Sequence, residues 1–196
     1  MSRISKIPAN EWDPELREMT AADSASVIEQ GLTRMLAHRP VMAKGLVGFL
    51  GAISANRTLP ERLIELVRLR VAFHNQCRSC MAIRYSSASD TVDESLVCSL
   101  EKPQEADHLS DAERAAIDFA DRYATDHLSV TDARFEALKE HFDEGQIIEL
   151  MLNIAAFVGF GRMGAILDMT EELPDHFKAQ WGKTVTPWGG QPVMVR

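Results

Sequence analysis

The sequence predicts an all-α fold, and three observations support that prediction. Apolar residues recur at helical spacing through most of the 196 residues. Residues that commonly cap helix starts precede several of these segments. No segment shows the period-two alternation and the β-branched residues that are typical of a half-buried strand. We expect a single domain over residues 1–196, with an irregular tail rich in Gly and Pro from about residue 181.

Two helices are predicted in the N-terminal quarter of the chain. Residues 24–38 place their apolar side chains at helical spacing, which predicts one amphipathic helix. Residues 40–53 are apolar on nearly all sides, which indicates a buried helix, and Pro40 suits its first turn.

Two further helices are predicted around the pair of neighbouring cysteines. The first follows Thr58, which begins a capping box, and runs to about residue 75. After a short break, the second helix carries Cys80 and extends to about Ala88.

Capping residues mark the predicted helix starts in the rest of the chain. They are Thr91 with Glu94, Ser110 with Glu113, Thr131, and Asp143 with Gln146. The last pair opens a long apolar helix over about residues 146–169, which contains Gly159, Gly161 and Gly164. Because glycine lowers helix propensity, these three glycines predict the close approach of a neighbouring backbone.

Charge and hydropathy exclude several classes of function. Lys plus Arg number 21 against 29 Asp plus Glu, giving a net charge of −8 and a pI near 5.3. Such an acidic chain is not expected to bind nucleic acid. No apolar run is expected to reach the roughly 18 residues of a membrane span, and the N-terminus lacks the apolar core of a signal peptide. We therefore expect a cytoplasmic protein with no membrane partner.

Three cysteines carry the first chemical signal. Cys77 and Cys80 form a CxxC, whereas Cys98 stands alone on an apolar face and is expected in the core. A CxxC at a helix start brings two sulfurs together where the backbone N–H groups favour a thiolate, and Arg78 and Arg84 add positive charge. This arrangement predicts a dithiol that closes to a reversible disulfide. Two buried structural cysteines are the alternative.

Glu65 and Arg84 are candidate partners of the dithiol. Arg84 lies four residues after Cys80, so it shares a helical face with Cys80 if the helix continues. Glu65 lies twelve residues before Cys77, and an αα-hairpin would bring it alongside. Its carboxylate either accepts a proton from a thiol, directly or through a water, or pairs with Arg84.

A zinc site is the competing interpretation of the same segment. His74, Cys77 and Cys80 read H-x-x-C-x-x-C and offer three ligands, with Cys98 or a distant histidine as the fourth. No second closely spaced ligand pair is visible, so we expect neither a metal nor a cofactor besides the disulfide. The other histidines are scattered and are expected at the surface or in caps: His38, His108, His127, His141 and His176.

The spacing of these residues resembles the signature of alkylhydroperoxidase D (AhpD), in the carboxymuconolactone decarboxylase superfamily. Glu65 is followed by eleven residues, the CxxC, three residues and the polar Arg84. The segment RLRVAFHNQCRSCMAIRY resembles the core motif of the family, and LSDAERAAIDFADRYATD and IIELMLNIAAFVGFGRM resemble its later helices. The resemblance spans roughly residues 35–170.

The resemblance implies a helical bundle whose core hairpin carries the CxxC at a helix N-terminus. It implies a homotrimer or homohexamer that reduces hydroperoxides and is recharged by an external dithiol. By position, Cys80 matches the cysteine that attacks the peroxide, Cys77 matches the resolving cysteine, and Glu65 matches the proton-relay glutamate.

The chain departs from the family motif in its basic residues. Arg84 replaces the family's histidine, and Arg78 and Ser79 stand between the cysteines where a histidine is common. Arginine stays protonated and cannot act as a base, so Arg84 is expected to act as a fixed cation, with His74 as a stand-in base. The superfamily also contains lactone decarboxylases without cysteine chemistry. A lyase or small-acid-binding protein with incidental cysteines is therefore the second hypothesis, and a zinc-stabilised interaction module is the third.

Assembly is also expected from the apolar helices. One bundle of this size has limited room to bury both residues 40–53 and residues 146–169. A second subunit is expected to cover part of that surface, and the tail is expected to be able to lie on a partner subunit.

Overall fold

The computed structural model describes residues 2–178 and 183–196, and the prediction of an all-α fold is confirmed for this part of the chain. The helices are α1 (Pro14–Met19), α2 (Val27–Gln30), α3 (Thr33–Leu36), α4 (Pro40–Ala55), α5 (Glu61–Asn75), α6 (Arg78–Ala82), α7 (Glu94–Ser99), α8 (Asp111–Thr125), α9 (Asp132–Lys139) and α10 (Glu144–Leu167). Two short strands, β1 (Ile83–Tyr85) and β2 (Val193–Val195), complete the regular structure together with five 3-10 turns, η1–η5.

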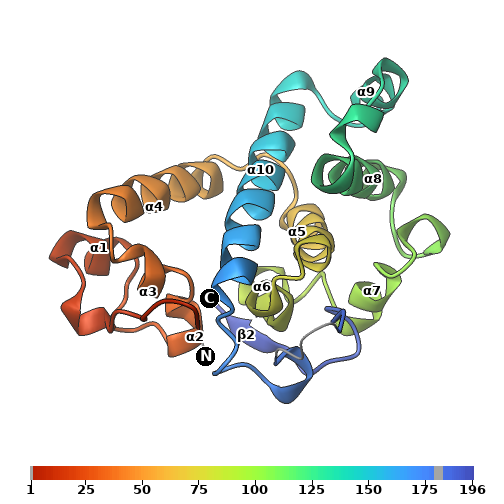
Figure 1. Ribbon diagram of the computed structural model, residues 1–196. Coiled ribbons are helices and arrows are strands. Elements are labelled where there is room, and N and C mark those ends of the chain that lie inside the picture. The colour runs from red at the N-terminus through yellow and green to blue at the C-terminus, as the bar shows by residue number, and fades with distance from the viewer. Residues whose placement is uncertain (1, 179–182) are drawn as a thin grey trace.

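The main core forms where α5 packs between α8 and α10 (Figure 1). Fully buried aliphatic side chains from these three helices interlock, among them Leu66, Val67, Ile117, Leu150 and Ile154. Each such side chain contributes roughly 1.5–3 kcal/mol through its removal from water. Because α5 is buried on most sides, the segment after it, which carries both cysteines, starts from a fixed position.

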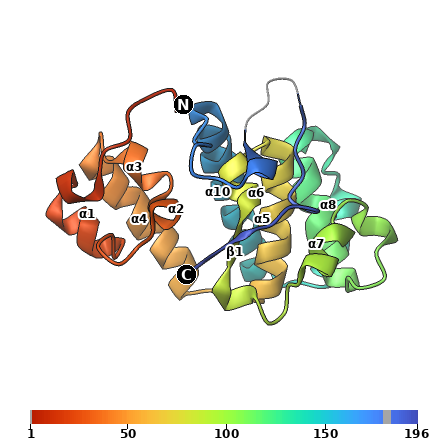
Figure 2. The same ribbon diagram turned by 90° about the horizontal axis from the view of Figure 1, so that it is seen from below.

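The N-terminal helices α1 to α4 lie on one side of α10 (Figure 2), and α1, α3 and α4 contribute to a smaller core there. The predicted single helix over residues 24–38 is wrong, because the chain forms α2 and α3 with a break between them. Gly31 ends α2 with a φ of 42°, a conformation that side-chain-bearing residues seldom adopt.

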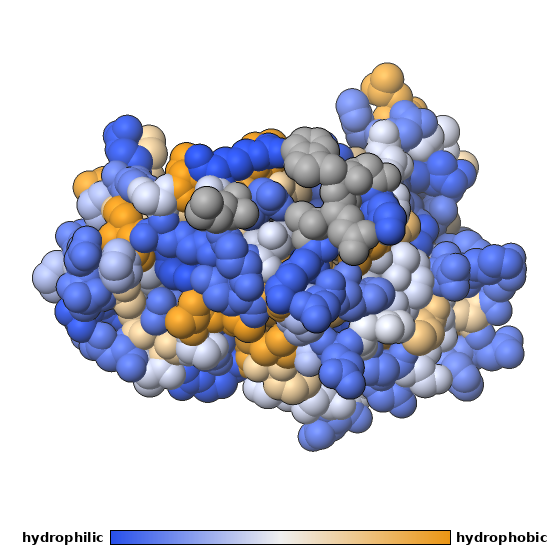
Figure 3. Space-filling model, turned by 60° about the horizontal axis from the view of Figure 1, so that its bottom comes forward, coloured by the Kyte–Doolittle hydropathy of each residue, from blue (hydrophilic) through white to orange (hydrophobic). Residues whose placement is uncertain are grey.

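Helix α4 begins at Pro40 as predicted, but the expectation that it is buried is wrong. Only Ala43 on this helix is buried, while Val41 is 79% exposed and Met42 is 64% exposed. Apolar side chains therefore remain on the outer surface of α4. Figure 3 shows hydrophobic atoms gathered in patches between hydrophilic regions on one face of the molecule.

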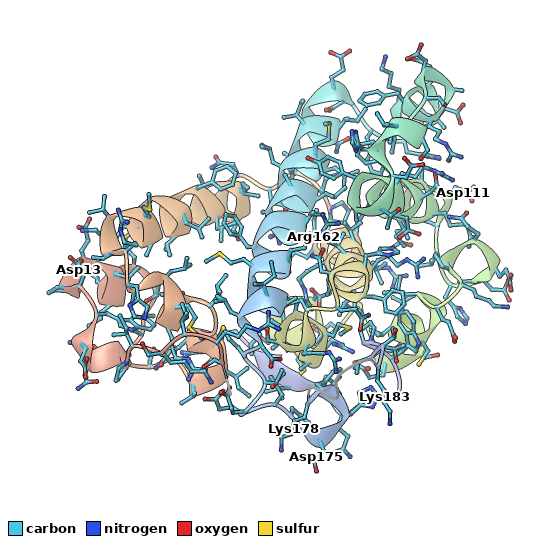
Figure 4. All side chains as sticks on the ribbon, viewed as in Figure 1. Asp13, Asp111, Arg162, Asp175, Lys178 and Lys183 are labelled. Atoms are coloured by element: carbon cyan, nitrogen blue, oxygen red, sulfur yellow. A yellow bond between two sulfur atoms is a disulfide. The ribbon has the colours of Figure 1, made fainter. Side chains whose placement is uncertain are left out.

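Helix α10 runs through the middle of the molecule (Figure 1) and is long and apolar enough to cross a membrane by length and composition. By length and composition, the expectation that no apolar segment is long enough to span a membrane is therefore wrong. The helix packs against α5, α6 and α8 and carries Arg162, which lies between α10 and α5 (Figure 4). Of its most apolar window, 33% is buried inside the molecule.

Gly161 and Gly164 on α10 approach side chains and not the neighbouring backbone that the sequence led us to expect. A Cβ atom at Gly161 would lie 2.5 Å from Nδ2 of Asn75, and one at Gly164 would lie 3.4 Å from the sulfur of Cys77. A Cβ atom at Gly159 would meet nothing within 4 Å. Two of the three glycines thus let α10 close onto the end of α5 and the start of α6.

Two of the predicted capping boxes are confirmed, at Ser110 before α8 and at Asp143 before α10. Thr58 does not cap α5, because Pro60 occupies the N-cap and Thr58 instead donates to Glu149. The cap predicted at Thr91 is also wrong. Asp93 caps α7 by accepting from the backbone N–H of Leu96, and Thr131 occupies the N-cap of α9 without a side-chain hydrogen bond.

The segment after the cysteines does not continue as a helix to Ala88 as predicted. Helix α6 ends at Ala82, and β1 pairs in parallel with β2 near the end of the chain, with Arg84 opposite Met194. The tail therefore lies on its own chain and includes a strand, although the start predicted for it near residue 181 falls outside the described residues. Strand pairing with a distant segment overrides the local helical pattern here.

Candidate functional site

Cys77 and Cys80 form a disulfide, with their Cα atoms 5.2 Å apart, so the predicted pairing is confirmed. Gln76 turns the chain out of α5 in the left-handed conformation, and Cys77 follows as the N-cap of α6. Cys77 is fully buried against α10. Cys80 is half-buried and lines a cavity, so it is the sulfur that a bound molecule meets first.

Cys98 lies on α7 as a free, exposed cysteine. The expectation that it is a core residue is wrong, because the buried face of α7 is formed by Leu96 and Val97. Cys98 is therefore separate from the disulfide pair.

A cavity of about 580 Å³ lies beside Cys80, with α4, α5, α6 and α10 among its walls. Most of its lining is apolar, and two aromatic side chains, Phe157 and Phe160, come from α10. Its charged side chains include two pairs, Arg57 with Glu61 and Glu65 with Arg68. The cavity is large enough for a small organic molecule.

Glu65 lies on α5 in the wall of this cavity and is 4% exposed. Its partner is Arg68, one helical turn further along, and not Arg84, so the ion pair with Arg84 is not formed. Arg68 Nε donates to Glu65 Oε2 at 2.6 Å, and Nη2 donates to Oε1 at 2.7 Å. Both carboxylate oxygens are thus held in one bidentate pair.

Arg68 is the site residue that the sequence-based reasoning missed. Besides holding Glu65, it donates to the backbone carbonyl of Cys80 at 2.6 Å and to that of Ile83 at 3.0 Å. The ring of Tyr85 lies 5.1 Å from its guanidinium carbon. Burial disfavours the charged form, but the charge and hydrogen bonds of Glu65 outweigh it and raise the pKa of Arg68. The i,i+3 spacing of Glu65 and Arg68 on α5 was the available signal.

Arg84 lies beyond the end of α6, so the prediction that it shares a helical face with Cys80 is wrong. Its guanidinium is paired with Glu94, with Nε 2.8 Å from Oε1. It also donates to the carbonyls of Met81, Ile83 and Pro187. Because α6 ends at Ala82, the four-residue spacing no longer places Arg84 above Cys80. Arg84 ties β1 to the tail.

The neighbouring polar residues also hold the tail. Gln76 donates to the carbonyl of Val185 and accepts from its N–H. Arg78 donates to the carbonyls of Lys178 and Lys183, both labelled in the lower part of Figure 4. The basic residues around the CxxC therefore anchor the end of the chain.

His74 is placed as neither the stand-in base nor a zinc ligand. Its Nε2 lies 2.7 Å from Oδ1 of Asp121 on α8, and Arg70 also donates to Asp121. Burial raises the pKa of Asp121, but the hydrogen bonds from His74 and Arg70 outweigh it, so its pKa lies below the usual range. Within residues 2–178 and 183–196, no three His, Cys, Asp or Glu side chains are grouped to hold a metal.

No protein-family model matches this chain. An uncharacterised protein of Mycobacterium tuberculosis, Rv2313c, is 34% identical over 110 residues, which is 55% of this chain and 38% of that protein. The same protein from strain CDC 1551 matches equally. The match thus spans about two fifths of the length of these curated relatives.

Solved structures show the fold more fully. An uncharacterised peroxidase-related protein with an AhpD core, from Ralstonia eutropha JMP134, is 22% identical with a TM-score of 0.66 over 90% of this chain and 94% of that one. A candidate AhpD antioxidant-defence protein of unknown function from Agrobacterium tumefaciens is 20% identical, with a TM-score of 0.61 over 71% and 97%. A variant of the debrominase Bmp8 in complex with 2,3,4-tribromopyrrole is 18% identical, with a TM-score of 0.67 over 86% and 92%. The chain has an AhpD-like fold, as the resemblance implied.

Proposed function

We propose that the protein is a thiol-dependent peroxidase that reduces organic hydroperoxides. The observation that carries this proposal is the asymmetric disulfide. Cys77 is buried, whereas Cys80 lines an apolar cavity that also contains the buried Glu65. The AhpD-like fold supports the same function.

The reaction starts from the reduced dithiol. Cys80 loses its proton to Glu65, and the thiolate attacks one oxygen of the O–O bond. That oxygen stays on sulfur as a sulfenic acid, while the other oxygen leaves with a proton as an alcohol. The Cys77 thiol then attacks the sulfenic sulfur, water leaves, and the Cys77–Cys80 disulfide forms.

An external dithiol completes the cycle by transferring two electrons and two protons to the disulfide. This reductant can attack the sulfur of Cys80, because Cys80 lines the cavity whereas Cys77 is fully buried. We propose that this cycle runs in the cytoplasm, where dithiol reductants are maintained.

A peroxide-consumption assay tests the proposal. With cumene hydroperoxide as substrate and dihydrolipoamide as reductant, the protein should consume peroxide over many turnovers. Cys98→Ser is the matched control and should retain this activity, because Cys98 is separate from the pair. Disulfide formation without peroxide consumption would contradict the proposal.

Reductive debromination of an aromatic ring is a second candidate. The likeness to Bmp8 and the aromatic lining from Phe157 and Phe160 favour it. In that reaction the ring exchanges bromine for hydrogen, bromide and a proton are released, and the dithiol closes to a disulfide. Release of bromide from a bromopyrrole by the reduced protein, without consumption of cumene hydroperoxide, would favour this candidate.

We propose that the chain forms a homotrimer or homohexamer. Five large apolar side chains on two helices are between 43% and 79% exposed. They are Val41, Met42 and Phe49 on α4 and Ile148 and Ile166 on α10. Burying them against a second copy would remove this apolar surface from water. Light scattering should give a mass of three or six chains, and a monomeric mass at micromolar concentration would contradict this.

A further inference from the structure

Arg68 connects the two reactive parts of the candidate site. Its guanidinium donates to both carboxylate oxygens of Glu65 and, through Nη1, to the carbonyl of Cys80. Its side chain is 7% exposed, and the Tyr85 ring lies over it. The buried Arg68 guanidinium thus holds Glu65, the proposed proton acceptor, in a fixed position relative to Cys80.

We propose that Arg68 is the positioning residue and shared counter-ion of the dithiol, which pairs with the Glu65 carboxylate before proton transfer and stabilises the Cys80 thiolate afterwards. This inference rests on the proposed thiol chemistry. The sequence had suggested Arg84 for the role of fixed cation, but the contacts of Arg84 with Glu94 and the tail leave that role to Arg68.

The charge balance of the proton transfer supports this role. Before transfer, Arg68 and the Glu65 carboxylate form a neutral pair beside a neutral thiol. The proton of the Cys80 thiol moves to Glu65, directly or through a water, and leaves a thiolate and a neutral carboxyl group. Without a cation, this step would place a negative sulfur in an apolar cavity, which is costly. With Arg68 present, one positive and one negative charge remain together throughout.

Other charged groups around the cavity are committed to different partners. Arg57 pairs with Glu61 on the same face, and Arg196 pairs with Glu29. Tyr85 from β1 lies against Arg68 itself. From the other wall, the polar side chain supplied by α10 is the neutral Asn153. Arg68 is therefore the cation joined to both Glu65 and Cys80.

Alkylation of Cys80 against pH tests the proposal. The background is Cys77→Ser with Cys98→Ser, so that Cys80 is the single thiol, and the probe is iodoacetamide. Arg68→Met should move the midpoint of the rate profile upward by about one pH unit or more, because the thiolate loses its counter-ion. Glu65→Gln should move the midpoint downward by a similar amount, because Arg68 is then the counter-ion of the thiolate alone. Arg68→Lys, which keeps the charge, should recover most of the upward shift.

Arg57→Met is the matched control, since Arg57 lines the same cavity and also pairs with a glutamate on α5. It should leave the midpoint unchanged. If Arg68→Met leaves Glu65 unpaired and unfolds the protein, the alkylation midpoint can still be measured in two other variants. These are Arg68→Lys and the double variant Arg68→Met with Glu65→Gln. The double variant should give a midpoint above that of Glu65→Gln, because the thiolate then has no Arg68 cation beside it.

Shifts of the same sign in Arg68→Met and Glu65→Gln would overturn the proposal. A profile of Arg68→Met that coincides with that of the background carrying Arg68 would also overturn it. A role limited to folding would change thermal stability and leave the midpoint in place. Because the assay contains no peroxide, its failure is distinct from failure of the proposed peroxidase activity.

Discussion

Cys80→Ser is expected to lower peroxide turnover by at least about 1000-fold, because it removes the nucleophile that the cavity exposes. A hydroxyl group at this position has no comparable ionised form near neutral pH. The disulfide closes a loop with only two residues between its cysteines, so its loss restricts the unfolded chain little and the variant should fold. Peroxide consumption and circular dichroism on the same sample measure both properties.

Cys77→Ser is the informative comparison, because Cys77 is buried and the proposal gives it only the resolving role. The first turnover should proceed at close to the wild-type rate and leave Cys80 heavier by one oxygen atom in mass spectrometry. Sustained turnover should then fall. If Cys77→Ser abolished the first turnover and Cys80→Ser did not, the assignment of the two cysteines would be reversed.

Local patterns were sufficient to predict the core of the fold. The capping boxes at Ser110 and Asp143 and the helical periodicity around them identified α8 and α10. The CxxC spacing identified the disulfide, and Glu65 lies in the wall of the cavity that Cys80 lines. Each of these features depends on residues close in sequence or on a spacing that a continuous helix preserves.

Long-range contacts explain the predictions that failed. Helix α6 ends at Ala82 because β1 pairs with a strand more than one hundred residues later, which no local pattern reports. Because α6 ends before Arg84, this residue does not share a helical face with Cys80 and pairs with Glu94 instead. Arg68 was missed because its bond to the Cys80 carbonyl depends on how α6 folds back on α5.

Arg84→Met is expected to cost about 2–4 kcal/mol of unfolding free energy, which corresponds to a fall in Tm on the order of 10 °C. The Arg84 side chain is 5% exposed and donates to Glu94 and to three carbonyls from two separate parts of the chain. Its loss leaves the carbonyls of Met81 and Pro187 without this donor. Because Glu94 is 44% exposed and can be rehydrated, most of the cost arises at the carbonyls.

Arg78→Ala provides the control, because Arg78 also donates to the tail but from a half-buried position through carbonyls nearer to solvent. It should cost less than about 1 kcal/mol. Thermal melting measures the difference, and limited proteolysis should cleave the C-terminal segment faster in Arg84→Met, because the tail loses the hydrogen bond from Arg84 to the carbonyl of Pro187. The alkylation midpoint of Cys80 should stay in place in Arg84→Met. A stable Arg84→Met variant with a raised midpoint would instead restore Arg84 as the cation of the dithiol and argue against Arg68.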